Sequence, residues 1–162
     1  MKVIIQEYQP SDKPEIIKLM ETLQDFIADI DPLHRHRRLP EYGELYTEGL
    51  LKKISDHAGV IYLARQGQEI LGCIAGNIEE QSKEERAGTV KSRSGRILVL
   101  IVQEKCRGKG VGSDLMKKIE DYFRLNGCDI VRVEVFVPNS SAHNFYNRMH
   151  YDDRVYDMVK QL

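Results

Sequence analysis

The chain has 162 residues and a mass of 18.7 kDa, which is the size of one domain. Hydrophobic residues make up 41% of it and charged residues 30%, a balance typical of globular proteins that excludes a disordered chain. Because 24 Lys and Arg stand against 25 Asp and Glu, the net charge is −1 and offers a polyanion no bulk attraction. We therefore expect no nucleic acid partner.

The cysteines and the apolar runs bear on compartment and membrane association. Cys73, Cys106 and Cys128 are odd in number and widely spaced, so they indicate neither a disulfide framework nor a structural zinc site. The longest apolar run, Ile97 to Val102, falls far short of the roughly 20 residues that a membrane helix needs. We expect a cytoplasmic protein that holds no metal ion and does not enter a membrane.

The first half of the chain combines β-branched runs with helical periodicity. Apolar residues from Ile16 to Ile30 recur at three- and four-residue spacing, and those from Tyr42 to Ile54 do the same, so both stretches predict amphipathic helices. Gln66-Gly67-Gln68 separates two apolar runs and predicts a tight hairpin. In chain order, the expected elements are a strand over 3–8, helices over 16–30 and 42–56, and strands over 59–65 and 69–78.

The second half predicts a central strand followed by further strands and helices. Residues 79–95 are polar, and we expect either a solvated loop or the frayed ends of the flanking strands there. The run from Ile97 to Val102 does not alternate, which predicts a strand covered on both faces. Beyond it, the expected elements are a helix over 111–122, a strand over 131–137, a helix over 142–149 and a last strand over 151–159.

This order of elements mixes hairpins with crossovers and so predicts an α/β (α+β) fold with a mixed sheet. We expect a single domain over residues 1–162, with a central sheet of about six to seven strands flanked by helices.

The segment between the central strand and the next helix has the composition of a phosphate cradle. Glycines let the backbone approach an anion closely, and a helix start adds unpaired amides and the positive end of its dipole. Residues 91–118 carry eight Lys and Arg against two Asp and Glu, so this segment is basic although the whole chain is not. The residues expected to hold a phosphate are Arg107, Gly108, Lys109, Gly110, Val111, Gly112 and Ser113.

Two common nucleotide-binding motifs do not fit this segment. A P-loop requires a Lys directly after its last glycine, and no Lys follows Gly112. A dinucleotide fingerprint could begin at Gly108, but its third glycine position is Ser113. A glycine-rich turn without a ligand is the alternative, although three glycines and two cations in six residues exceed what a turn needs.

The run Arg107-Gly108-Lys109-Gly110-Val111-Gly112 matches the Arg/Gln-x-x-Gly-x-Gly/Ala signature of the GNAT superfamily of acyl-CoA-dependent N-acyltransferases, which the chain resembles. The preceding strand and the downstream segment over 139–146 are also similar to the family's, as is the order of elements over nearly the whole chain. The resemblance implies a sheet that splays between the strands ending near Val102 and Val137.

The resemblance also implies how acetyl-CoA is held. The amides at the start of the helix would bind its pyrophosphate, and the backbone of Leu100 and Val102 would pair with the pantetheine arm like an added strand. In the family, the position of Asn139 faces the acyl donor and acceptor. From the residues alone Asn139 is also a good helix N-cap, and the two roles are compatible.

Tyr146 has a catalytic role implied by the resemblance, as the general acid that protonates the departing CoA thiolate. From the sequence alone it is a half-buried aromatic at the edge of the apolar face of the helix predicted over 142–149. A phenol of pKa about 10 protonates a thiolate whose conjugate acid has a pKa near 8.5 only where the thiolate is poorly solvated.

No residue stands out as the base that takes a proton from the acceptor. A lysine-like amine of pKa about 10.4 is only about 0.04% neutral at pH 7, and the neutral form is the nucleophile. Glu79 and Glu80 are candidates, directly or through water, with a solvated strand end as the alternative. His143 and His150 could titrate in the right range. The strand before the phosphate segment, where the family frequently carries a Glu, holds no acid.

The sequence therefore predicts an enzyme that transfers an acetyl group from acetyl-CoA to a primary amine of a small molecule, by direct attack in a ternary complex. The acid-rich start of the chain favours a cationic acceptor. The alternatives are a protein N-terminal or lysine acetyltransferase and a non-catalytic CoA-binding domain. A covalent route through Cys106 lacks a base and an orienting partner. Dimerisation is common in the family that the chain resembles.

Overall fold

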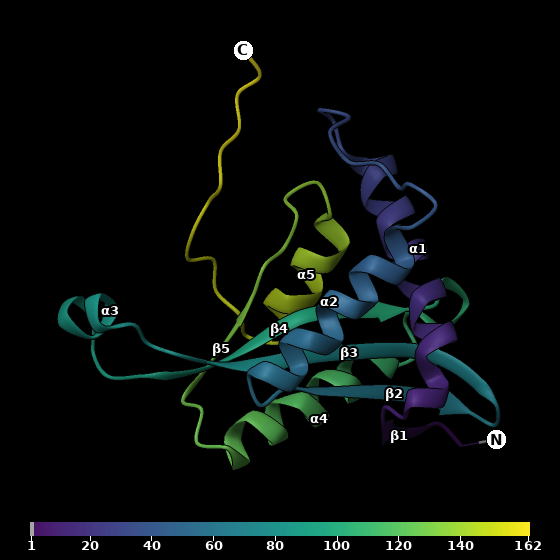
Figure 1. Ribbon diagram of the computed structural model, residues 1–162, viewed down its shortest axis with the longest axis horizontal. Helices are drawn as coiled ribbons and strands as arrows, with labels where there is room; N and C mark the ends of the chain where they lie inside the picture. The colour runs from purple at the N-terminus through teal and green to yellow at the C-terminus, as the bar shows by residue number, and fades with distance from the viewer. Residues whose placement is uncertain (1) are drawn as a thin grey trace.

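A computed structural model describes residues 2–162, and its strands form one mixed sheet (Figure 1). The elements are β1 (Ile4–Glu7), η1 (Pro10–Asp12), α1 (Lys13–Ile30), α2 (Tyr42–Asp56), β2 (Val60–Gln66), β3 (Glu69–Glu80), α3 (Lys83–Gly88), β4 (Arg93–Val102), η2 (Glu104–Cys106), α4 (Val111–Leu125), β5 (Ile130–Val133) and α5 (Ser140–Arg148). The strand order is β1-β2-β3-β4-β5, with only β4 and β5 parallel. The predicted fold class is confirmed, but the sheet has five strands instead of six to seven.

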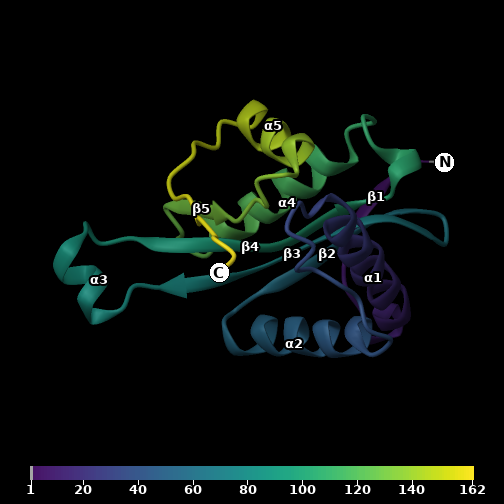
Figure 2. The same cartoon turned by 90° about the horizontal axis from the view of Figure 1, so that it is seen from above.

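Helices cover both faces of this sheet (Figure 2). On one face, α4 and α5 pack over a core in which Leu115, Ile119 and Phe123 are completely buried. On the other face, α1 and α2 pack over a second core that contains Ile16 and Met20. The buried faces of α4 and α1 are the apolar faces that the periodicity of the sequence predicts. None of the helices within residues 2–162 is long and apolar enough to cross a bilayer.

Residues 79–95 contain the ends of the two flanking strands, which was one of the two expectations, and a short helix that the sequence analysis did not predict. β3 continues to Glu80, β4 begins at Arg93, and the two strands form a long hairpin that projects from the body with α3 at its tip (Figure 1). A capping box starts α3, because Ser82 Oγ accepts a hydrogen bond from the Glu85 N–H (3.1 Å) and Glu85 Oε2 accepts one from the Ser82 N–H (2.7 Å). Polar residues form strand here because the hairpin arms pair with each other in solvent.

The last predicted strand, over 151–159, is absent from the described chain. Asp152–Leu162, which we call the C-terminal segment, is extended and exposed, and it stands away from the body (Figure 1). The apolar pattern that predicts a strand is present, but no neighbouring strand lies beside it in one copy of the chain. Strand formation depends on such a partner, and the pattern alone does not supply one.

Candidate active site

The sheet opens between its two parallel strands. β4 and β5 pair only from Ser94 opposite Ile130 to Ile97 opposite Val133, while β4 itself continues to Val102. The strands therefore separate where the splay was expected, although β5 ends at Val133 and not near Val137. From Leu98 onward, β4 has an edge without a strand partner on the β5 side.

The register with β3 determines which backbone groups of β4 face this opening. The Gln103 N–H donates to the Leu71 carbonyl (2.8 Å), and in an antiparallel ladder such bonded pairs alternate with non-bonded ones. The partners Gly72 with Val102 and Ile74 with Leu100 are therefore non-bonded pairs. The N–H and C=O groups of Leu100 and Val102 thus point away from β3, toward the opening.

The predicted phosphate segment forms the turn from β4 into α4. Gly108 and Gly110 have φ of +72° and +85°, the left-handed region that residues with a Cβ rarely adopt. Gly110 is the N-cap of α4, and no side chain caps the helix. The first intrahelical bond joins the Asp114 N–H to the Gly110 carbonyl (3.0 Å). The amides that precede it have no helical partner and belong to Val111, Gly112 and Ser113.

Gly112 brings the helix start against both β4 and α5. A Cβ at this position would lie 3.4 Å from Phe145 Cζ and 3.7 Å from Val102 Cγ2. Arg107 lies on the other side of the turn, where its Nε–H donates to the Val102 carbonyl (3.2 Å) and its guanidinium lies 5.8 Å from the Phe26 ring centre. The structure therefore brings together the predicted phosphate residues, the end of β4 and the helix that carries Tyr146.

Tyr146 is held in place by the end of its own helix. A Schellman motif closes α5, because the Tyr151 N–H donates to the Tyr146 carbonyl (3.1 Å) and the His150 N–H donates to the Asn147 carbonyl (3.0 Å). The rings of Tyr146 and Tyr151 lie 5.7 Å apart, and the Tyr151 hydroxyl donates to Glu120 Oε1 (2.8 Å). Among residues 2–162, the Tyr146 hydroxyl has no hydrogen-bond partner. Burial raises the pKa of Tyr146 to about 12.

The start of α5 also follows the sequence prediction. The Asn139 side chain accepts a hydrogen bond from the Ala142 N–H (3.1 Å), which confirms its role as N-cap.

Cys106 is buried in the core beneath α4 and packs as an apolar residue. His143 Nε2 lies 2.7 Å from Asp153 Oδ1, and His150 is exposed.

The two glutamates proposed as bases lie on the projecting hairpin. Glu79 pairs in register with Ser94, three residues before the point where β4 and β5 separate, or about 10 Å along the strand. Its Oε2 is 3.9 Å from Arg132 Nη1. Glu80 points to the opposite face and pairs with Arg93 (2.8 Å). Glu79 is thus the better placed of the two. No cluster of acidic, His or Cys side chains in the described chain is arranged to hold a metal ion.

The loop between α1 and α2 reaches the chain that follows β5. Buried Asp31 accepts hydrogen bonds from the N–H groups of Leu33 (3.0 Å), Arg35 (2.6 Å) and His36 (2.9 Å), and from the His36 side chain (2.9 Å). The His36 ring then packs edge-on against Phe136, with ring centres 5.1 Å apart. Phe136 follows β5, so the loop extends from the face of α1 to the β5 side of the opening.

One polar residue near this opening, Asn77, is not among the site residues expected from the sequence. Asn77 is 5% exposed, and its Oδ1 has no hydrogen-bond partner in the part of the chain described. It shares a face of β3 with Glu79, because residues two apart on a strand point the same way. The available signal was a single amide within the apolar run of β3, a position where a buried polar group is normally paired.

The fold and this site define an acyltransferase-like domain, and comparison with known proteins identifies its family. The model of the acetyltransferase (GNAT) family matches residues 20–151. The chain belongs to this family of acetyl-CoA-dependent acyltransferases, as the sequence resemblance suggested.

Two curated relatives carry matching segments. An uncharacterized N-acetyltransferase of Methanocaldococcus jannaschii is 41% identical over 68 residues, which is 41% of this chain and 44% of that protein. N-alpha-acetyltransferase 30 of Xenopus laevis is 31% identical over 113 residues, which is 70% of this chain and 38% of that protein. The match thus spans less than half the length of either relative.

Solved structures share the fold over nearly the full chain at low identity. A point mutant of the BH1408 protein from Bacillus halodurans has a TM-score of 0.86 at 17% identity, covering 98% of this chain and 99% of that one. Glucosamine-6-phosphate N-acetyltransferase from Arabidopsis thaliana has a TM-score of 0.69 at 19% identity, covering 99% of both chains. AAC(6')-Iy in complex with a CoA bisubstrate analogue has a TM-score of 0.69 at 15% identity, covering 100% of both chains.

Proposed function

We propose that residues 1–162 form one acetyltransferase domain that moves an acetyl group from acetyl-CoA to a primary amine of a small molecule. The observation that carries this proposal is the meeting of free amides at the start of α4 with the unpaired edge of β4. Gly112 lies within van der Waals reach of both Val102 and α5, so a ligand bound at the amides would extend directly along β4.

The residues present fit acetyl-CoA. The amides of Val111, Gly112 and Ser113 would bind the pyrophosphate, with Lys109 and Arg107 as nearby cations. The outward-facing N–H and C=O groups of Leu100 and the N–H of Val102 match the amides of the pantetheine arm, which need hydrogen-bond partners. The Val102 carbonyl accepts a hydrogen bond from Arg107 and would have to be shared with the ligand. Acetyl-CoA supplies the activated acetyl group.

Tyr146 is assigned to the leaving thiolate, as a hydrogen-bond donor at its phenol oxygen. Its pKa of about 12 keeps it protonated at any physiological pH. Complete proton transfer to a thiolate whose conjugate acid has a pKa near 8.5 would be uphill by about 5 kcal/mol. Donation without complete transfer still stabilises the charge that develops on sulfur, because burial strengthens such a bond.

The acceptor would enter beneath the loop that Asp31 organises. The unpaired Oδ1 of Asn77 is suited to accept a hydrogen bond from an amine, and Glu79 on the same face can take its proton directly or through water. The charge argument for a cationic acceptor is weaker than the sequence suggested, because two carboxylates of α1 are already paired. Asp25 is bound by Arg38 (2.6 Å) and Glu15 by Lys18 (2.8 Å).

A protein N-terminus is the second candidate acceptor. The relative that matches the larger part of this chain is N-alpha-acetyltransferase 30, which favours an α-amino group. The glucosamine-6-phosphate enzyme with the same fold favours a small molecule. An α-amino group has a pKa near 7.7 and is far more often neutral at pH 7 than a lysine side chain, so it places less demand on a base.

An acceptor panel read by product mass tests this assignment. Polyamines, aminoglycosides, amino sugars and short peptides with free or blocked N-termini are each incubated with acetyl-CoA and the full chain. Acetylation of a small amine at least tenfold faster than of any peptide supports the first candidate, and the reverse order supports the second. If acetyl-CoA binds but no amine is acetylated, the domain is a non-catalytic CoA-binding module.

A further inference from the structure

Tyr151 is the last residue of the chain that packs on the body of the domain. It lies against the core beneath α4, whereas Asp152–Leu162 are exposed. The centre of its ring is 5.7 Å from that of Tyr146, and its N–H donates a hydrogen bond to the Tyr146 carbonyl (3.1 Å). Tyr151 thus contacts Tyr146 through both its side chain and its backbone.

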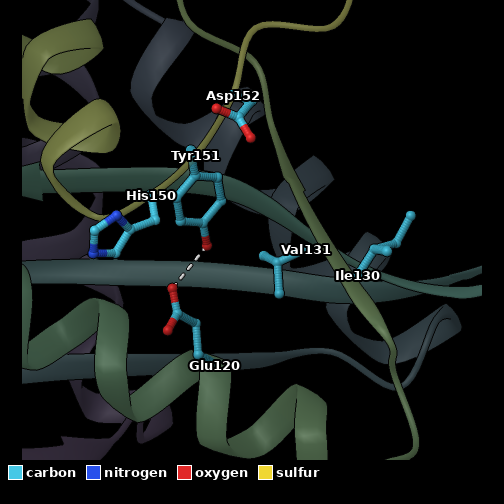
Figure 3. A pocket seen from close by; sticks show the side chains of 6 residues that line it. All are labelled: Glu120, Ile130, Val131, His150, Tyr151 and Asp152. Carbon is cyan, nitrogen blue, oxygen red and sulfur yellow. Dashed lines mark hydrogen bonds between the residues drawn. The ribbon is translucent and has the colours of Figure 1, made fainter.

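The Tyr151 hydroxyl joins this end of α5 to α4. It donates a hydrogen bond to Glu120 Oε1 (2.8 Å), and Figure 3 shows the two side chains pointing toward each other beside a groove of about 340 Å³. Ile130 and Val131 of β5 line the other side of this groove. Among residues 2–162, the Glu120 carboxylate has no other hydrogen-bond or ion-pair partner, so the Tyr151 phenol alone binds it.

Glu120 is a fixed point for this bond because the core holds the backbone of α4. Ile119 beside it and Phe123 in the next turn are completely buried. The helix begins at Val111 with the free amides of the phosphate segment, and a rise of 1.5 Å per residue puts Glu120 about 14 Å further along it. α4 therefore holds the proposed pyrophosphate site at its start and, through Tyr151, the end of α5.

The backbone of α5 closes the helix only weakly at this end. Tyr146 lies in the last turn of a nine-residue helix, where helices fray. The Schellman motif beyond it places His150 at φ +65°, where glycine is the usual residue because a Cβ is strained. After Tyr151, the described chain pairs with no strand of the sheet. The bond from Tyr151 to α4 therefore has a large share in holding Tyr146.

We infer that Tyr151 is a positioning residue for acetyl transfer, because its bond to Glu120 holds the Tyr146 phenol in the orientation that donates to the leaving thiolate. The inference rests on the proposed role of Tyr146 as that donor. A hydrogen bond weakens steeply with angle, and a displacement of about 1 Å at a reacting group can cost about 100-fold in rate. Tyr151 acts through Tyr146 and takes part in no bond that forms or breaks.

Substitutions at both ends of the bond test this role, with thiol release measured for the best amine of the acceptor panel. Tyr151→Phe should lower kcat by about fivefold or more and leave KM for acetyl-CoA within about twofold, because the thiolate charge develops only during the reaction. Glu120→Ala should do the same. Glu120→Gln keeps an oxygen that accepts a hydrogen bond and should retain kcat within about twofold. Tyr156→Phe, which loses a phenol bond to the Asp153 carboxylate (3.1 Å), is the matched control and should keep the wild-type kcat.

A double-mutant cycle shows whether Tyr151 acts through Tyr146. Tyr146→Phe and the double variant Tyr146→Phe/Tyr151→Phe should have the same kcat, because the group that Tyr151 positions is already absent. Losses that multiply in the double variant, or a Tyr151→Phe enzyme as fast as wild type, overturn the inference and leave the proposed role of Tyr146 intact. A Tyr146→Phe enzyme as fast as wild type overturns both.

Nuclear magnetic resonance on the free protein tests the positioning without turnover. In a chain with ¹³C-labelled tyrosine rings, the Tyr146 signal is the one that Tyr146→Phe removes. Tyr151→Phe should shift or broaden that signal, whereas Glu120→Gln and Tyr156→Phe should leave it in place. A Tyr146 signal that Tyr151→Phe does not change overturns the inference, even if the domain acetylates no amine and the proposed function fails.

Discussion

The edge of β4 from Leu98 to Val102 and the outer edge of β5 from Ile130 to Val133 both present backbone groups without a strand partner in the described chain. Their surroundings differ. A glycine turn, two cations and free helix amides adjoin β4, whereas an apolar extended segment adjoins β5. The same N–H and C=O groups therefore suit a thin anionic ligand at the first edge and another strand at the second.

The two edges also differ in how far other parts of the chain cover them. At the β4 edge, α5 lies against Gly112, and Arg107 reaches from the turn to Phe26 on α1. The loop held by Asp31 reaches Phe136 on the far side of the opening. The β5 edge has no such cover, and its groove opens to solvent beside Asp152. The side chains beside each unpaired strand edge thus indicate which kind of partner that edge suits.

Replacing Gly110 with Val should have the largest effect on the β4 edge. A β-branched residue is strained at φ +85°, so the turn would shift and carry the amides of Val111 and Gly112 out of line. Two lost hydrogen bonds to a charged phosphate, at about 1.5–3 kcal/mol each, correspond to binding at least 100-fold weaker. Calorimetric titration with acetyl-CoA measures this.

Gly127→Val is the control for backbone strain. Gly127 has nearly the same φ, +78°, but it lies at the opposite end of α4, where a Cβ meets only the Arg93 guanidinium at 3.8 Å. It should lower the melting temperature as Gly110→Val does and leave acetyl-CoA affinity within about twofold of wild type. Equal loss of affinity in both variants would mean that general destabilisation, and not the helix start, explains the result.

Replacing Tyr146 with Phe should lower kcat by about 10- to 100-fold, because one hydrogen bond to the charged sulfur is lost. The affinity for acetyl-CoA should stay unchanged. Because burial raises its pKa to about 12, ionisation of Tyr146 should cause no fall in rate between pH 8 and 10. Stopped-flow detection of the released thiol measures both. Tyr122→Phe, which loses only a bond to the Ala58 carbonyl, is the control. A Tyr146→Phe enzyme as fast as wild type removes Tyr146 from the mechanism.

Much of the β4 edge was predictable from the sequence because its determinants are local. Gly108 and Gly110 occupy left-handed positions that glycine favours, and Asn139 caps the helix that follows it. The helical stripes of α1 and α4 also follow directly from spacing. In each case a few consecutive residues fix both the conformation and its position.

What the sequence did not predict depends on contacts between distant segments. The strand partners Glu80 and Arg93 lie in a polar stretch of sequence where alternation gives no signal, although Ser82 and Glu85 do carry a capping box that marks α3. The contact of His36 with Phe136 joins residues 100 positions apart. The C-terminal segment has a strand pattern, but no strand of the described chain lies beside it.

Asp31→Asn should loosen the loop between α1 and α2 and reduce stability. Burial by itself raises the pKa of Asp31, but the hydrogen bonds from His36, Leu33 and Arg35 outweigh it and hold the pKa well below 3.8. The stabilisation is therefore present above pH 3.8 and is lost as pH falls through the lowered value. We expect a melting temperature several degrees below wild type at pH 7, with the difference shrinking below pH 4.

Asp29→Asn provides the matched control, because Asp29 is exposed one residue before the end of the same helix. It should melt with the wild type at every pH. A pH-independent difference for Asp31→Asn would show that its carboxylate charge is not what organises the loop.

His150→Gly should change the free energy of unfolding less than the other substitutions change the properties measured for them. His150 lies between the helix that carries Tyr146 and the C-terminal segment. At φ +65°, His150 occupies the left-handed position of the Schellman motif, which costs a residue with a Cβ about 1 kcal/mol relative to Gly. Urea unfolding should show His150→Gly more stable by that amount and His150→Ala no more stable than wild type. If both substitutions stabilise equally, the gain comes from removing the imidazole. If only Gly does, the strain lies in the backbone that positions Tyr146 and Tyr151 together.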